Sequence, residues 1–164
     1  MSRSRWVLLA ATGLALAGVV AAWALWPGAA APPVALLRTD DAQLLEQGRN
    51  IYAAQCASCH GVHREGQAHW RDRGADGRLP APPHDETGHT WHHPDELLFR
   101  ITQQGVAKAV GIEGYASNMP AYGGTLSDAQ IVAVLSWIKS QWPARVQADH
   151  DSINRQAREA QNGS

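Results

Sequence analysis

Apolar positions recur at the spacing of an α-helix in three segments of the chain. The first segment ends near Gln55, and a side chain able to cap a helix is present at Thr39, Asp40 or Asp41. Its repeating apolar or small positions are Leu44, Leu45, Gly48, Ile51 and Tyr52. This pattern predicts a helix from about residue 40 to residue 55.

The other two segments also carry signals of a helix start or end. The second covers about residues 94–104, with Pro94 in its first turn and Gly105 as a stop. The third begins with a capping box formed by Ser127 and Gln130. Its apolar stripe consists of Ile131, Val134, Leu135 and Ile138.

Two long segments, residues 56–93 and 106–125, show little periodicity, and the alternation typical of a strand is not found. The sequence therefore predicts an all-α fold. Loops longer than about 12–15 residues are uncommon in a compact domain unless they are functional. Because three short helices supply little core volume, something other than side chains is expected to fill the centre.

The start of the chain predicts a membrane segment. Residues 6–26 carry no charge, have tryptophan at both ends and follow Arg3 and Arg5. This length is close to the roughly 20 residues that a helix needs to cross a bilayer, and tryptophan favours the interface. We therefore expect residues 1–26 to be a retained signal anchor. The alternative is a signal peptide cleaved near "GAAAPP", although the apolar region of a signal is usually only about 7–15 residues long.

The arginines ahead of this segment predict that the rest of the chain is exported. In a bacterium the domain would then lie on the periplasmic side of the inner membrane, or be soluble in the periplasm after cleavage. Residues 27–38 are rich in proline and alanine and predict a tether. Residues 39–142 are expected to form one domain. Residues 143–164 are expected to form a polar tail, frayed or disordered after Pro143 ends the last helix.

The charges of the chain nearly cancel. Lysine and arginine number 14 against 15 aspartates and glutamates, which leaves a formal net charge of −1. Since no long run of one sign is present, nothing indicates binding to nucleic acid.

Both cysteines of the chain lie in "CASCH", as Cys56 and Cys59, and His60 follows directly. This is the spacing of c-type haem attachment. Two cysteines about one helical turn apart can form thioethers to the two vinyl groups of a haem, and the adjacent imidazole then lies over the iron. We therefore expect one covalently attached haem c, with His60 as an iron ligand.

Other chemistries of a cysteine pair fit the chain less well. A structural zinc site needs four protein ligands, and a third cysteine is lacking. A thioredoxin-like dithiol belongs to a βαβ pattern, which is not found here. A structural disulfide suits an exported protein, but a bridge over so short a spacing would constrain little of the chain.

Met119, in "SNMPAYGG", is the expected second iron ligand. The other methionine is Met1, on the far side of the predicted membrane segment. Met119 lies in the second irregular segment, followed by Pro120 and by glycines, which favours a fixed and close approach over simple packing. A histidine and methionine pair raises the reduction potential of the iron, so the expected chemistry is one-electron transfer.

The chain resembles the monohaem class I c-type cytochromes, in a membrane-anchored bacterial form. The resemblance rests on "GRNIYAAQCASCHG", "NMPAYGGTLSDAQ" and "VLSWIKS", and it covers about residues 40–142. It implies that the first and last helices of the domain cross at Gly48, Tyr52 and Trp137. It also implies that a proline carbonyl accepts the proton of the His60 ring, from Pro80, Pro82 or Pro83.

Four of the eight histidines, His84, His89, His92 and His93, cluster in "PPHDETGHTWHHPDELL". A second metal site, with copper as an example of a metal that imidazoles bind well, is one interpretation. The favoured interpretation is structural: these residues would cap the helix at 94–104 and hydrogen-bond around the haem edge, where Trp91 could donate to a propionate. Their spacing matches no recognised ligand motif.

These features predict an electron-transfer protein rather than an enzyme. It would carry single electrons in a respiratory chain, with a terminal oxidase, a quinol–cytochrome c reductase or a dehydrogenase as partner. It could also be a cytochrome subunit of such an oxidase or dehydrogenase complex. The alternative from another class is a haem sensor or catalyst in which Met119 leaves the iron.

Overall fold

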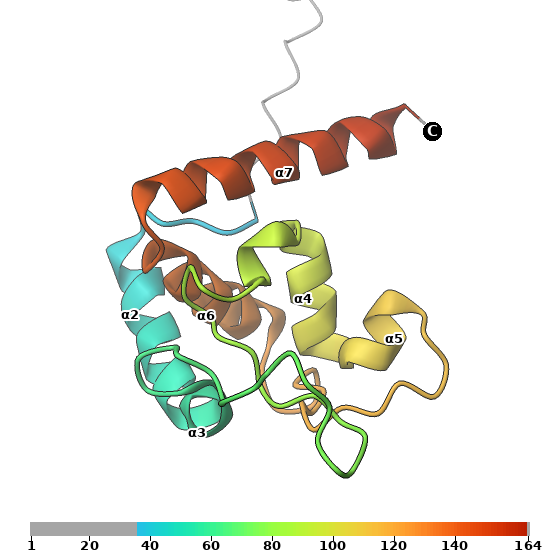
Figure 1. Cartoon of the computed structure of the whole chain (residues 1–164). Helices are drawn as coiled ribbons and strands as arrows, with labels where there is room; N and C mark the ends of the chain where they lie inside the picture. The colour runs from blue at the N-terminus through green and yellow to red at the C-terminus, as the bar shows by residue number, and fades with distance from the viewer. Residues whose placement is uncertain (1–35, 164) are drawn as a thin grey trace, which may run out of the picture. The chain divides into compact units, whose positions relative to one another are not determined.

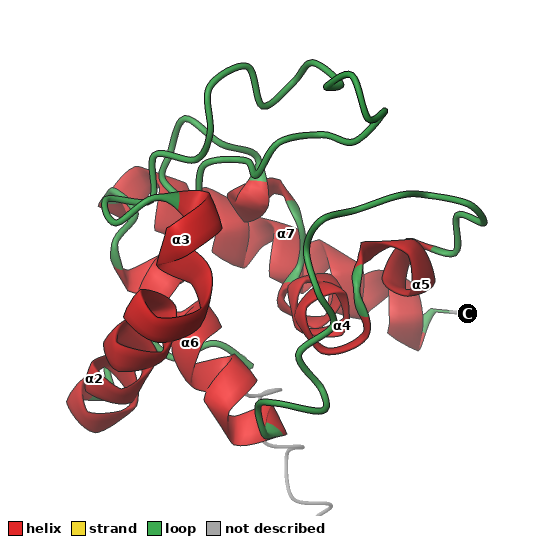
Figure 2. Ribbon diagram, turned by 90° about the horizontal axis from the view of Figure 1, so that it is seen from below, coloured by secondary structure: helices red, strands yellow, loops and turns green. Residues whose placement is uncertain are grey.

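The computed structural model describes residues 36–163, and within this range every regular element is a helix, with no strand (Figure 1, Figure 2). The predicted all-α class therefore holds for the described residues. The elements are α2 (Ala42–Ile51), the π-helix η1 (Tyr52–Cys56), α3 (Ala57–His60), the 3-10 helix η2 (Thr90–His92), α4 (Asp95–Gln104), α5 (Val106–Val110), α6 (Asp128–Ser140) and α7 (Ala144–Asn162).

The predicted membrane segment at residues 6–26 lies outside the described part of the chain. Among residues 36–163, no helix combines the length and apolar character that crossing a bilayer requires.

Helix α2 packs against α6, and this pair frames the core. The α2 start is capped by Asp41, whose carboxylate accepts a hydrogen bond from the N–H of Leu44 at 3.0 Å. At the crossing, Gly48 of α2 is buried, and a Cβ atom there would overlap the carbonyl oxygen of Ala133 in α6. The rings of Tyr52 and Trp137 lie beside this crossing with centroids 4.7 Å apart. The predicted crossing of the first helix and α6 is confirmed.

The helical path of α2 does not end near Gln55 but continues through η1 and α3 to His60. In η1 the hydrogen bonding widens to the fifth residue, as the N–H of Ala57 donates to the carbonyl of Tyr52. A π-turn holds one more residue than an α-turn, so it rotates the residues that follow it around the helix axis.

Two short elements follow the long loop. Helix α4 agrees with the predicted helix at 94–104, although Pro94 is its N-cap and not a first-turn residue. Helix α5 was not expected, because the sequence suggested an irregular segment from residue 106. It is bounded by Gly105 and Gly111, both with positive φ, and its single turn is too short to show a periodic pattern.

Helix α6 begins with the predicted capping box. The Ser127 hydroxyl accepts from the N–H of Gln130, and the Gln130 side chain accepts from the N–H of Ser127. Helix α6 ends at Ser140, ahead of Pro143, which is the N-cap of α7.

The expectation of a frayed or disordered tail after Pro143 is wrong, because α7 occupies this segment as a regular helix. Figure 1 shows α7 passing the start of α4. The tail is polar, but its inward side chains have partners. Val146, His150 and Asn154 are buried, and Lys139 of α6 pairs with Asp151 at 2.5 Å. Buried polar groups are stable when they are hydrogen-bonded, so a polar sequence does not prevent packing.

The packed domain also begins earlier than the predicted boundary at residue 39. Leu37 belongs to the core and is only 3% exposed. Its N–H donates to the Asp95 carboxylate at 3.0 Å, and the N–H of Arg38 donates to the hydroxyl of Ser136 at 3.0 Å. The end of the predicted tether is therefore part of the domain. The rest of the core consists of Tyr52, Leu98, Leu126, Ile131, Val134, Leu135, Ile138, Trp142 and Val146.

Candidate haem site

The side chains of Cys56, Cys59 and His60 meet at the end of the first helical segment. Cys56 closes η1 and is the N-cap of α3, while Cys59 and His60 are the last residues of α3. Both cysteines are free thiols rather than a disulfide. Burial, together with the neighbouring Cys59, raises the pKa of the Cys56 thiol to about 11, so Cys56 is protonated at neutral pH.

A cavity of about 610 Å³ adjoins these residues. It is lined by both cysteines, His60 and, from the far segment of the chain, Met119. The sequence-predicted site residues therefore line one common space. Its apolar lining includes Leu98 and Ile101 of α4 and Val134, Leu135 and Ile138 of α6.

His60 is 7% exposed, and its ring is oriented by the backbone. The Nδ1 atom lies 2.8 Å from the carbonyl oxygen of Pro82. Because a carbonyl can only accept, Nδ1–H is the donor and Nε2 is the nitrogen left with a free lone pair. Burial lowers the pKa of His60, which favours the neutral imidazole that binds metal ions. Of the three prolines proposed as the acceptor, the structure selects Pro82.

Two glycines hold the Pro82–Pro83 segment in place. A Cβ atom at Gly66 would lie 2.7 Å from the carbonyl carbon of Pro82, and one at Gly88 would lie 2.8 Å from that of Pro83. Real Cβ atoms do not approach other atoms so closely, so both positions require glycine, which has no Cβ atom. The long loop therefore brings the acceptor of His60 into position by close backbone packing.

Met119 enters the cavity wall from the loop between α5 and α6. Its N–H donates to the hydroxyl of Ser117 at 3.1 Å, and the residue is half-buried. Tyr122, three residues later, ties this loop to the rest of the site. Its N–H donates to the carbonyl of Thr102 at 2.9 Å, and its hydroxyl donates to the carbonyl of Gln55 at 2.7 Å. The role of Tyr122 was missed by the sequence interpretation, although an aromatic residue directly after Met-Pro-Ala was the available signal.

The four clustered histidines lie in different surroundings. The ring of His84 stacks on His60 with centroids 3.8 Å apart, that of His89 on Trp70 at 5.3 Å, and that of His92 on Trp91 at 3.6 Å. Among residues 36–163, no three His, Cys, Asp or Glu side chains are grouped so that they could hold a metal ion.

The expected capping role of these histidines is wrong. The α4 N-terminus receives no cap from Pro94 or the loop before it, and instead the N–H of Asp95 donates to the side-chain oxygen of Asn154 in α7 at 2.7 Å. The Trp91 indole donates to the carbonyl of Glu86 at 3.3 Å, so it already has a partner within the loop.

Comparison with known families decides what kind of domain encloses this cavity. A family model described as cytochrome c oxidase, cbb3-type, subunit III matches residues 43–138, which is more than half of the chain. The chain belongs to this family. It is a c-type cytochrome. Searches of curated proteins and of solved structures gave no significant match.

Membership in this family suggests electron transfer and implies covalently bound haem c. The residues of the cytochrome fit that group in three respects. The cavity is large and mainly apolar, as cofactor sites are. The two free thiols lie on its wall beside His60, whose Nδ1 already has a partner. Met119 supplies a thioether to the same space.

Proposed function

We propose that the cytochrome is a one-electron carrier of a respiratory chain. In this proposal the haem is joined to Cys56 and Cys59, and its iron is ligated by His60 and Met119. The observation that carries the proposal is the bond from His60 Nδ1 to Pro82, because it leaves Nε2 as the ligating nitrogen in a cavity that Met119 also lines.

The bound haem would supply an iron centre that exchanges single electrons between Fe(II) and Fe(III). The chain sets the conditions for that exchange. The carbonyl of Pro82 orients His60 and increases the basicity of its ring, as partners of metal-bound histidine do. The thioether of Met119 favours Fe(II) and raises the potential. The apolar residues of α4 and α6 limit the access of water.

The partner that the family description favours is a terminal oxidase. Subunit III of a cbb3-type oxidase works within an oxidase complex, and we infer the same kind of association for this cytochrome. A quinol–cytochrome c reductase and a dehydrogenase are the other two partners to be tested, each as a donor or an acceptor of electrons.

The uncharged residues 6–26, after Arg3 and Arg5, support a single-pass anchor that places the domain on the periplasmic side. Cleavage of this segment would instead leave a soluble periplasmic carrier.

Acid–acetone extraction of the full chain, expressed with a c-type maturation system, tests the central claim. The colour should remain with the polypeptide, and the Cys56→Ala and Cys59→Ala variants should each weaken the attachment. The matched control is Ser58→Ala, between the two cysteines, which should keep the colour bound. Extraction of the haem into the solvent from the wild-type protein would refute the proposal.

A second experiment separates a subunit from a free carrier. The full chain is purified from native membranes in mild detergent, and its elution on size exclusion is compared with that of the oxidase. A subunit should elute together with oxidase haem absorbance. The intact mass of the mature protein is measured on the same sample, to locate its N-terminus. Elution of the cytochrome by itself, from membranes with active oxidase, would favour the free carrier. A mature start between about residues 25 and 35 would exclude the anchor.

A further inference from the structure

The imidazole of His84 lies flat against the imidazole of His60. The centroids are 3.8 Å apart and the ring planes differ by 16°. This is a face-to-face contact with the side chain that the proposed function makes an iron ligand. The contact is formed by residues that are 24 positions apart, so the long loop must return to place it.

The backbone of His84 is fixed on both sides. Its N–H donates to the carbonyl of Arg64 at 2.8 Å, and its carbonyl accepts from the indole Nε1 of Trp142, also at 2.8 Å. Two residues earlier, Pro82 accepts from His60. One short segment therefore holds His60 twice, at the edge of the ring through Pro82 and over its face through His84.

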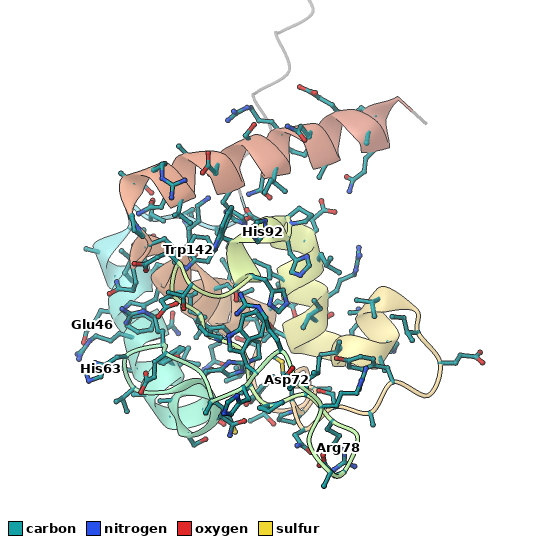
Figure 3. The ribbon with its side chains drawn as sticks, in the orientation of Figure 1. Glu46, His63, Asp72, Arg78, His92 and Trp142 are labelled. Atoms are coloured by element: carbon teal, nitrogen blue, oxygen red, sulfur yellow. The ribbon has the colours of Figure 1, made fainter. Side chains whose placement is uncertain are left out.

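Trp142 connects this arrangement to the C-terminal part of the chain. The residue is 3% exposed and lies between α6 and α7, on the side of the domain nearest α7 in Figure 3. The rings of Trp142 and His150 of α7 form a T-shaped contact, with centroids 5.1 Å apart and planes at 80°. The tryptophan is thus locked by packing, and its hydrogen bond to His84 has little freedom to move.

His84 also carries an unusual cost. Its Nδ1 is shielded from solvent and has no hydrogen-bond partner among residues 36–163. A buried polar atom without a partner is destabilising, and an apolar ring of similar size would avoid this cost. The two backbone hydrogen bonds of His84 hold its ring where the flat face contacts His60.

A face contact restricts His60 in a way that the bond to Pro82 does not. Hydrogen bonds to a carbonyl oxygen tolerate a broad range of directions, so the bond from Nδ1 permits the ring to rotate about the axis through Nε2. A flat ring against one face blocks that rotation, because any turn drives the edge of His60 into its neighbour. The angle of the ligand ring determines which d orbitals of the iron it interacts with.

We propose that His84 is a positioning residue for the iron ligand: by stacking on His60, it sets the rotation of that imidazole about its bond to the iron. This inference rests on the proposed ligation by His60. It assigns to one member of the histidine cluster a role in the site, through shape rather than through metal binding.

Two apolar variants separate ring shape from polarity. His84→Phe keeps a flat ring, while His84→Leu fills the position without one. The control is His92→Leu, since His92 also stacks on an aromatic ring, is exposed and does not line the cavity. The measurements are the haem methyl shifts in the proton NMR spectrum of the ferric protein, which report the angle of the ligand ring, and the reduction potential.

The methyl shift pattern should change in His84→Leu and keep the wild-type order in His84→Phe and His92→Leu. The reduction potential should rise in both His84 variants, because each removes a polar group near the charged Fe(III) state. We expect the equilibrium constant for one-electron reduction to increase about threefold. At 59 mV for a tenfold change, this rise is about 28 mV. Trp142→Phe, which removes the donor to the His84 carbonyl, should shift the methyl pattern in the direction of His84→Leu.

Equal methyl patterns in His84→Leu and His84→Phe, whether both wild-type or both altered, would overturn the proposal. If His84→Leu fails to retain haem, an unchanged pattern in Trp142→Phe would overturn it and a shifted pattern would support it. The wild-type protein is first tested for covalent haem and for the Met119 ligand. Failure of that test counts against the proposed function, whereas failure of the variants to differ counts against His84.

Discussion

Gly48 of α2 lies so close to Ala133 of α6 that a Cβ atom at residue 48 would overlap the carbonyl oxygen of Ala133 and stand 2.7 Å from the Cβ atom of Trp137. The obstacle on the α6 side is backbone, which cannot move aside as the end of a side chain can. This contact sets the distance between the two helices that frame the core, and the rings of Tyr52 and Trp137 pack beside it.

Gly48→Ala is therefore expected to destabilise the cytochrome. Overpacking costs about 1–3 kcal/mol and sometimes more, and the better helix propensity of alanine, about 1 kcal/mol, offsets only part of it. The free energy of unfolding should fall by about 2 kcal/mol, measured by denaturant titration of the haem-loaded protein. The control is Gly124→Ala, where nothing lies within 4 Å of an added Cβ atom. Equal stability of the two variants would contradict the tight crossing.

Met119→Ala is expected to change the electronic state of the iron. The weak near-infrared band from sulfur to iron should disappear, the potential should fall, and carbon monoxide should bind readily to the reduced variant. Each 59 mV of fall is a tenfold change in the one-electron equilibrium. Ser117→Ala, which removes the hydroxyl that accepts from the N–H of Met119 but keeps the sulfur, should retain the band. A wild-type protein that lacks the band and binds carbon monoxide fully at neutral pH would instead favour the sensor or catalyst interpretation.

Asn154→Ala is expected to loosen α7 from the domain. The Asn154 side chain accepts from the N–H of Asp95 at 2.7 Å and donates to its carboxylate at 2.9 Å. Asp95 is buried, so the variant leaves its N–H without a partner, at a cost of about 1–3 kcal/mol, and removes one of the hydrogen bonds to its carboxylate, which keeps the bond from the N–H of Leu37. Amide hydrogen exchange should accelerate in α7 and at the start of α4. Asn162→Ala, at an exposed position of the same helix, should leave exchange unchanged, and equal rates in both variants would argue against the cap.

The burial of His150 predicts that the free energy of unfolding of the cytochrome falls in acid. The residue is fully buried, and burial followed by the charge of Lys139 lowers its pKa, although Asp95 and Asp151 act in the opposite direction. Because the unfolded chain then binds a proton more readily than the folded one, the stability is complete above the unfolded pKa of about 6.5 and falls as the pH drops through the folded pKa.

The corresponding measurement is the free energy of unfolding of the wild type and of His150→Gln between about pH 8 and pH 5. This range spans the ordinary pKa of histidine. The advantage of the wild type over the variant should shrink as the pH falls below about 6.5. Parallel curves for the two proteins would mean that His150 does not titrate differently in the folded state.

The sequence alone determined the parts of this protein that depend on neighbouring residues. The capping residues Asp41 and Ser127 were among those predicted, because a cap bonds to backbone groups only a few positions away. The attachment motif from Cys56 to His60 is equally local, and it indicated the c-type cytochrome family that the family comparison then showed. The helix α5 escaped prediction because one turn between two glycines has no detectable period.

Only the tertiary structure decided how distant polar residues pair. The polar sequence after Pro143 suggested a frayed tail, yet Asn154 bonds to Asp95 across 59 positions and so caps α4. The choice of Pro82 over its neighbours and the stacking of His84 on His60 likewise follow from the path of a long loop. No local pattern encodes these contacts, because a buried polar side chain is stable wherever the fold supplies its partner, and that partner can come from any part of the chain.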